Sequence, residues 1–182
     1  MRIITGLAVF ALTTAALAAS PIPFGNSHYR TIARDPYALA SSDLNGDGHA
    51  DLVVLTHGDV QTDPGFAEVL INNGDGTYAD PVSYTVGAFP RSVRIADFNN
   101  DTFPDIATAN DVSDDTSVLL NNGDGTFGAA VSYGIGSSGI GVEVGDFDGD
   151  GDIDLATASS PGHIVAVWLN DGAGVFTLGI TP

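Results

Sequence analysis

The chain contains no cysteine and no lysine, and its five basic residues are all arginines. Without cysteine, the fold has neither a disulfide nor a thiolate metal site. The five arginines stand against 23 acidic residues, which gives a formal net charge of −18. This charge argues against binding to nucleic acid, whose phosphates require a basic surface, and against binding to an anionic membrane face.

Helical periodicity and catalytic signatures are also missing. No stretch after the first 19 residues repeats its apolar residues at helical spacing, which predicts an all-β chain. The four histidines neither cluster nor follow the spacing of zinc ligands. A Gly-x-Ser-x-Gly elbow, a phosphate loop and a dinucleotide fingerprint are all absent from the sequence. We therefore expect the protein not to be an enzyme.

The first 19 residues are predicted to be a secretory signal peptide. Arg2 supplies a positive charge, the segment from Ile3 to Leu17 is apolar, and Ala16-Leu17-Ala18 has the small-x-small pattern of a cleavage site. The alternative is a retained membrane or assembly helix, because the apolar run is almost long enough to span a bilayer. We expect a secreted or cell-surface protein that begins near Ala19 or Ser20, with residues 20–182 forming a single β-repeat domain.

The acids that are present are almost all aspartates, since Glu68 and Glu143 are the only glutamates. They recur in one ten-residue phrase, which reads DLNGDGHADL from Asp43, DFNNDTFPDI from Asp97 and DFDGDGDIDL from Asp146. Each copy has an oxygen-bearing side chain at positions 1, 3, 5 and 9. Such alternation allows a short turn to surround a hard cation, and calcium fits better than magnesium, which demands octahedral geometry. Turns of Asp, Asn and Gly without any metal are the alternative.

A second phrase follows each of these loops. It reads VLINNGDGTY to Tyr78, VLLNNGDGTF to Phe127 and VWLNDGAGVF to Phe176, with 49 residues between copies. We interpret it as a hairpin turn followed by an aromatic core residue. A second ligand-binding turn is the alternative. Trp168 takes the place of a leucine in this phrase, so it is expected to pack in a strand, or alternatively to form a platform for a sugar ring.

The repeat extends to both ends of the sequence. Pro36 aligns with Pro90, so the segment from Phe24 to Asp43 matches the tail of a preceding copy and includes a surplus strand near Ser27 to Ala33. The repeats run over about 24–77, 78–126 and 127–175, and a half-phrase covers 176–182. About 49 residues per unit is the size of a four-stranded propeller blade. Around the second loop, strands are expected at Ser92 to Ala96, Ile106 to Ala109, Ser117 to Leu120 and Ala129 to Ile135.

From Phe24 to Pro182 these units resemble FG-GAP/VCBS repeats, the integrin-α-like β-propeller blades that carry DxDxDGxxD calcium loops. The resemblance implies an all-β fold of three tandem four-stranded blades, forming a partial or open propeller that oligomerisation could complete. It also implies that each calcium loop joins the first and second strands of its blade, and that the aspartate at position 9 closes the site.

About three calcium sites are expected, with side chains at positions 1, 3, 5 and 9 and the carbonyl at position 7 as ligands. Position 6 is glycine in two loops but Thr102 in the second, where a β-branched residue resists a left-handed backbone. We therefore expect the second site to be distorted and the weakest. The predicted ligands are Asp43, Asn45, Asp47, His49 and Asp51; Asp97, Asn99, Asp101, Phe103 and Asp105; and Asp146, Asp148, Asp150, Asp152 and Asp154.

Three blades are too few to close a propeller, which usually has four to eight. The unpaired strand edges at the two ends of the repeats could therefore pair with a strand from another chain. We expect a self-assembling structural or adhesive protein that forms a homo-oligomer or an extracellular filament. A carbohydrate-binding, lectin-like module is the alternative, with glycans or other cell-surface proteins as partners. Its candidate loops are Thr56 to Ala67, Asp111 to Thr116 and Ser159 to His163.

Overall fold

The computed structural model describes residues 32, 34–58, 62–136, 138–160 and 162–179, and the statements below concern these residues. They form twelve strands and include no helix, so none of them makes an apolar helix that could span a membrane. The expected signal peptide lies outside the described residues, as does the surplus strand near Ser27 to Ala33 apart from Ile32.

The strands form three antiparallel sheets of four, each a meander of consecutive strands. We call these sheets blades 1, 2 and 3. Blade 1 contains β1 (Pro36–Ser42), β2 (Asp51–Thr56), β3 (Pro64–Leu70) and β4 (Val82–Ala88); blade 2 contains β5 (Pro90–Ala96), β6 (Asp105–Asn110), β7 (Asp115–Leu119) and β8 (Val131–Gly134); blade 3 contains β9 (Gly139–Gly145), β10 (Asp154–Ser159), β11 (Ile164–Asn170) and β12 (Phe176–Leu178). The all-β, three-blade architecture and the four strands expected around the second loop are confirmed.

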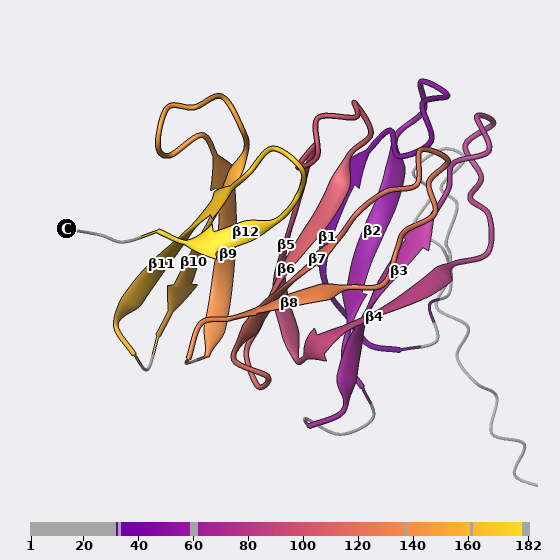
Figure 1. Cartoon of the computed structure of the whole chain (residues 1–182). Coiled ribbons are helices and arrows are strands. Elements are labelled where there is room, and N and C mark those ends of the chain that lie inside the picture. Colours follow the sequence, from indigo (N-terminus) through magenta and orange to yellow (C-terminus); the bar gives the residue numbers. More distant parts are fainter. Residues whose placement is uncertain (1–31, 33, 59–61, 137, 161, 180–182) are drawn as a thin grey trace, which may run out of the picture.

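The blades stand side by side in an open row, with blade 2 between blades 1 and 3 (Figure 1). The inner strands β1, β5 and β9 lie next to one another in that order. Within the described part of the chain the row does not close into a ring or barrel, so blades 1 and 3 each have one face without a neighbouring blade.

Each gap between neighbouring blades is filled by an apolar core. β2 and β6 are largely buried, and β6 lies in the middle blade, which has a neighbouring blade on each side. The first core contains Leu44, Val53, Leu55, Ala67, Val69 and Val86 of blade 1 and Val93, Ile106, Leu119 and Phe127 of blade 2. The second contains Phe98, Ala107, Ala109 and Val118 of blade 2 and Val142, Leu155, Ala166, Trp168 and Phe176 of blade 3.

The aromatic residues of the second phrase take part in these cores. Phe127 packs edge-on against Tyr84, and Phe176 packs edge-on against Tyr133. Trp168 is 8% exposed, and its ring centroid lies 5.6 Å from that of Tyr133. The expectation that Trp168 packs in a strand is therefore confirmed.

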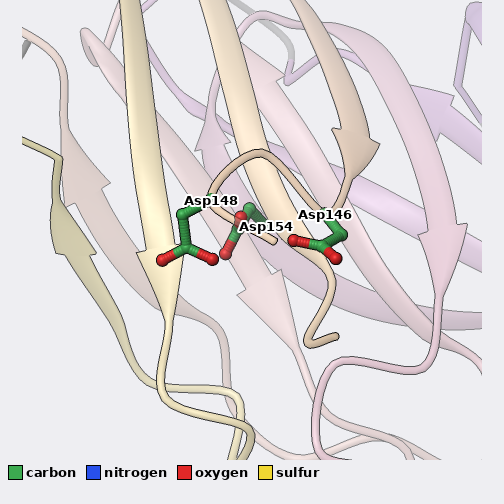
Figure 2. Close-up of side chains that lie close together, drawn as sticks. All are labelled: Asp146, Asp148 and Asp154. Atoms are coloured by element: carbon green, nitrogen blue, oxygen red, sulfur yellow. The ribbon is translucent and has the colours of Figure 1, made fainter. Parts of the chain in front are cut away.

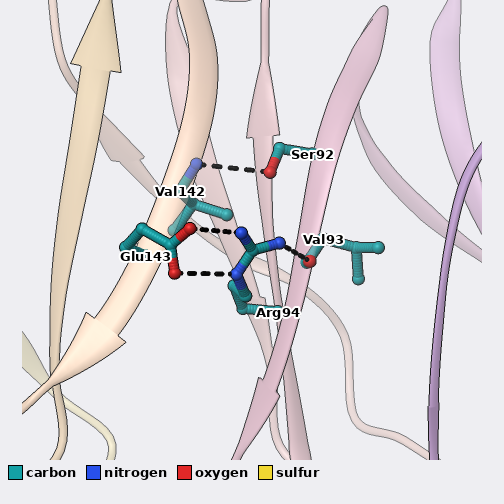
Figure 3. A network of polar contacts seen from close by, with 5 residues as sticks. All are labelled: Ser92, Val93, Arg94, Val142 and Glu143. Atoms are coloured by element: carbon teal, nitrogen blue, oxygen red, sulfur yellow. Dashed lines mark hydrogen bonds and ion pairs between the residues drawn. The ribbon is translucent and has the colours of Figure 1, made fainter.

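An ion pair also joins the inner strands of blades 2 and 3. Arg94 on β5 reaches Glu143 on β9 with both ends of its guanidinium, at 2.9 Å from Nε to Oε2 and through an Nη2–Oε1 pair (Figure 3). Nη1 of Arg94 donates to the carbonyl of Val93, which holds the side chain along the strand (2.9 Å). The hydrogen bonds from Arg94 hold the pKa of Glu143 below its usual range.

Candidate metal centres

The three aspartate-rich loops occupy equivalent places in the fold. They connect the first and second strands of each blade, between β1 and β2, between β5 and β6, and between β9 and β10. The loops of blades 2 and 3 touch, because Nδ2 of Asn100 donates to Oδ1 of Asp152 (2.8 Å). The location implied by the family resemblance is therefore correct, and each loop lies at the same end of its blade.

The aspartate at position 1 organises each loop by accepting backbone amides. In the first loop, Oδ1 of Asp43 accepts from the amide of Gly46 and Oδ2 from the amide of Gly48, each at 2.8 Å. The amide at position 6 reaches the same oxygen in the other loops, at 2.8 Å for Asp97 and 3.2 Å for Asp146. In each loop the backbone thus wraps around the carboxylate of the aspartate at position 1.

The aspartate at position 9 is fully buried in every loop, as Asp51, Asp105 and Asp154. In the second loop, Oδ2 of Asp105 accepts from the amide of Phe98 (2.8 Å) and Oδ1 from the amide of Asn121 (2.7 Å). The other two make the same pair of bonds. Burial raises the pKa of Asp105 to about 6, with smaller contributions from the charges of Asp101 and Asp97, although its two backbone hydrogen bonds oppose the rise.

The third loop concentrates carboxylates. Oxygen atoms of Asp146, Asp148 and Asp154 lie within 4.8 Å of one another, and Figure 2 shows the three side chains converging. The backbone amide of Asp150 lowers the pKa of Asp148, but burial and the charges of Asp150, Asp154 and Asp146 together outweigh it, so the net shift is upward. A set of oxygen donors that repel one another fits a hard divalent cation such as calcium.

The first two loops have asparagine at position 3 instead. Nδ2 of Asn45 donates to Oδ2 of Asp47 (2.9 Å), and Asn99 does the same to Asp101 (2.8 Å). This hydrogen bond is the main cause that lowers the pKa of Asp47. Because an amide replaces a carboxylate, these loops hold less negative charge than the third, and a cation would compete with the asparagine for the same carboxylate.

The second loop follows the same path as the others. Thr102 has a φ of 77°, close to the 86° and 98° of Gly48 and Gly151, and Asn100 has 60° where the other loops have glycine. The expected distortion is therefore absent, because position 6 keeps its left-handed backbone even with a β-branched side chain. The loop retains conformational strain at Thr102 instead, and its weaker affinity stays a prediction.

Comparison with known proteins agrees with this geometry. A profile described as an FG-GAP-like repeat matches residues 43–108 and again 97–157. The chain belongs to the FG-GAP-like repeat family. No curated protein matches it. Among solved structures it is similar to an Agrocybe aegerita lectin, described as recognising non-reducing terminal N-acetylglucosamine. That similarity has a TM-score of 0.53 and 27% identity over 77% of this chain, which spans about a third (36%) of the lectin chain.

In this FG-GAP-like protein the second phrase also joins neighbouring blades. Nδ2 of Asn121 donates to the carbonyl of Leu44 in blade 1 (2.8 Å) as well as to Pro104 in its own blade (3.0 Å). Asn170 bonds in the same way to Phe98 of blade 2 (2.7 Å). The interpretation as a hairpin turn is confirmed, but sequence analysis missed this inter-blade bond. The first asparagine of the phrase, present in all three copies, was the available signal.

Proposed function

We propose that this chain is a secreted, calcium-binding repeat protein with a structural or adhesive role, and that it works by self-assembly rather than by catalysis. The observation that carries the proposal is the set of three oxygen-lined loops, one at the same end of each blade in an open row. Calcium there would neutralise carboxylates that otherwise repel one another, in the segments that tie each blade to the next. The predicted signal peptide supports secretion.

The ligands we propose are the side chains at positions 1, 3, 5 and 9 of each loop, with the carbonyl at position 7. The side chains at position 7 are already engaged or packed elsewhere: the ring of Phe103 lies against the turn at Gly123, and Asp152 accepts from Asn100. Calcium accepts six to eight oxygen ligands in flexible geometry, and extracellular modules bind it with Kd values of about 10⁻⁴ to 10⁻³ M.

Calorimetric titration tests the metal proposal. Calcium at about ten times its Kd should stabilise the fold by about 1.4 kcal/mol for each occupied site. Asp148→Ala, which removes the ligand oxygens at position 3, should remove the heat of the third site, whereas Asp124→Ala, in an exposed turn, should leave it unchanged. Calcium that produced neither heat nor a shift in the unfolding temperature would refute calcium binding.

Size measurement tests assembly separately. Light scattering and electron microscopy in calcium should show oligomers or filaments, and a chelator should reduce them. A protein that remained strictly monomeric in calcium would rule out the self-assembling role without bearing on the metal sites.

A lectin-like function is the second candidate, favoured by the similarity to the Agrocybe aegerita lectin. The side chains that could serve it lie at the opposite end of the blades from the metal loops. There the rings of His57 and Phe89 stack at 3.8 Å, and Arg91 lies over Phe89 at 4.8 Å while bonding to Asp111. Tyr37, which is 50% exposed, borders this group. Glycan-array binding that Tyr37→Ala abolishes would support this candidate, and a silent array would reject it.

A further inference from the structure

We infer that the three metal loops are coupled in series through Asn121 and Asn170, so that calcium bound at one loop increases the calcium affinity of the loop in the neighbouring blade. The inference rests on the proposed calcium binding and goes beyond it by making these two asparagines positioning residues for the ions. Each stands where the third strand of its blade enters the hairpin turn, and both are buried, at 4% and 5% exposed.

Asn121 contacts two metal loops at once. Its backbone amide donates to Oδ1 of Asp105, the position-9 aspartate of the second loop (2.7 Å), and its Nδ2 donates to the carbonyl of Pro104 in that loop (3.0 Å). The same Nδ2 donates to the carbonyl of Leu44 in the first loop, at 2.8 Å. The position of this one side chain is therefore fixed by both loops together.

Asn170 makes the same contacts one blade further along. Its backbone amide donates to Oδ1 of Asp154 (2.8 Å), and its Nδ2 donates to the carbonyl of Ile153 (2.9 Å), both in the third loop. The same Nδ2 donates to the carbonyl of Phe98 in the second loop, at 2.7 Å. Because both joints between blades have this connection, it is a property of the repeat and not of a single contact.

The residue at position 2 of each loop completes the connection. Its backbone amide donates to the position-9 carboxylate of its own loop, at 2.8 Å in the first two loops, and its carbonyl accepts from the asparagine of the following blade. One continuous series of hydrogen bonds therefore runs through all three position-9 carboxylates, each of them fully buried. Its members, in order, are Asp51, Leu44, Asn121, Asp105, Phe98, Asn170 and Asp154.

Neither asparagine can turn independently of the loops, because its polar atoms are all engaged. A side-chain amide has two N–H donors and an oxygen with two lone pairs. Both donors of Asn121 are used as described, and its Oδ1 accepts from the amides of Gly123 (2.9 Å) and Gly125 (3.3 Å). Asn170 accepts in the same way from two glycine amides, each at 3.2 Å. A buried polar group that is fully satisfied is rigid, so it transmits a shift of one loop to the next.

Further contacts join the same loops. A Cβ added at Gly125 would lie 3.4 Å from Cβ of Asn45, the position-3 residue of the first loop. The turn that holds Asn121 thus lies against a residue that we propose as a calcium ligand. At the second joint, Nδ2 of Asn100 in the second loop donates to Oδ1 of Asp152 in the third (2.8 Å).

We expect the coupling to be positive because the ordering of a shared asparagine is common to two sites. Without an ion, the carboxylates of a loop repel one another, and hydrogen bonds alone hold the loop against that repulsion. An ion in the first loop removes the repulsion and fixes the carbonyl of Leu44, which fixes Asn121 and the orientation of Asp105. The second ion then binds a loop that is already ordered, so its binding removes less conformational entropy.

Electrostatics acts in the opposite direction, since the first ion reduces the negative charge that attracts the second. Each loop nevertheless stays negative with a divalent ion bound, because the first two loops contain three aspartates each and the third contains five. Every loop is also open to solvent at position 5, where salt screens charges that lie more than about 8 Å apart at physiological ionic strength. The coupling through hydrogen bonds therefore dominates in physiological salt.

An NMR titration of the full chain with calcium chloride tests the inference. The amides of Gly48, Thr102 and Gly151 report the three loops separately, since each donates to the position-1 carboxylate of its own loop. Asp47→Ala removes an exposed ligand and silences the first loop. In an otherwise wild-type chain, it should raise the calcium dissociation constant of the second loop by about fivefold or more, a typical coupling between sites.

Asn121→Ala should abolish this dependence of the second loop on the first, so that Asp47→Ala then has no effect there. A merely structural role of Asn121 would lower stability and leave the dependence in place. Asn122→Ala is the matched control, because Asn122 is exposed and its Nδ2 donates to Oγ1 of Thr126 in its own turn (3.0 Å); it should keep the full effect.

Circular dichroism in chelator checks that each variant folds. If Asn121→Ala did not, Asn170→Ala combined with Asp148→Ala, which silences the third loop, would give the same test at the second joint. The titrations are done at two protein concentrations about tenfold apart, because coupling within one chain is independent of concentration, whereas coupling through self-assembly is not.

The outcomes separate the inference from the proposed function. If Asp47→Ala left the second loop unchanged, the loops would be independent, and the inference would fall while calcium binding stood. A dependence that survived Asn121→Ala, or that changed with protein concentration, would equally overturn it. If none of the three amides shifted with calcium, the proposed calcium binding itself would be wrong.

Discussion

Thr102 in the second metal loop provides a direct test of how backbone strain is distributed among the blades. Its φ of 77° lies in the left-handed region, which a β-branched residue occupies at a cost of about 1–3 kcal/mol. The side chain is exposed, so removing it sacrifices little packing. Glycine accepts this backbone without strain, but its greater conformational freedom in the unfolded chain costs about 0.5–1 kcal/mol of stability. Thr102→Gly should therefore stabilise the protein by about 1 kcal/mol, which for a domain of this size raises Tm by about 2–4 °C.

The reverse change in the third loop is the matched partner. Gly151 has a φ of 98°, and a Cβ added there would meet no atom within 4 Å, so Gly151→Thr introduces backbone strain without a steric clash. It should destabilise the protein by about the amount that Thr102→Gly gains. Gly48→Thr, which is equally free of neighbours, should behave in the same way.

Urea unfolding followed by circular dichroism measures both effects. The experiment should be done in chelator, so that calcium does not contribute to the free energy of unfolding, and then repeated in calcium. If Thr102→Gly were neutral or destabilising while Gly151→Thr cost nothing, the left-handed conformation would carry no strain and the reasoning would be refuted. In calcium, Thr102→Gly should also increase the affinity of the second site.

Three further outcomes are expected. Asn170→Ala should destabilise the protein by about 3 kcal/mol, because the carbonyls of Phe98 and Ile153 lose their donor. Asn72 makes no inter-blade bond to a described residue, so Asn72→Ala should cost about 1 kcal/mol less. Equal costs of the two substitutions in urea unfolding would contradict the inter-blade role. Arg94→Gln should return the pKa of Glu143 upward in an NMR titration. Because the fold lowers the pKa of Glu143, the ion pair stabilises the folded protein above pH 4.5, and this stabilisation is lost as the pH falls through the folded-state pKa. Both side chains are exposed, so the loss should stay under about 1 kcal/mol. N-terminal sequencing of secreted protein should begin at Ala19 or Ser20, and a start at Met1 would contradict the signal peptide.

Several features could be predicted because they are local in the chain. The metal loops depend on alternating aspartates within ten residues, and the hairpins depend on Asn-Gly and Asp-Gly pairs that favour tight turns. The four strands around the second loop follow from short β-rich runs between those turns. The burial of Trp168 also followed from the repeat, since leucine occupies its place in the other two copies.

Other features depend on how the chain folds around each loop, and not on the residue types of the loop alone. The acceptor of Asn121 is a carbonyl of the previous blade, and the left-handed backbone of Thr102 is maintained although its own side chain disfavours it. Burial of Asp105, which raises its pKa, likewise results from how the blade folds around the loop.

The sequence by itself determined three repeated all-β units with oxygen-rich loops, because turn chemistry and strand alternation act between near neighbours. Only the tertiary structure decided which copies of each repeated position are buried. Val93 and Leu39 occupy the same place in their units, yet one is 3% and the other 70% exposed. The difference arises because burial depends on whether another blade lies alongside, which no single repeat specifies.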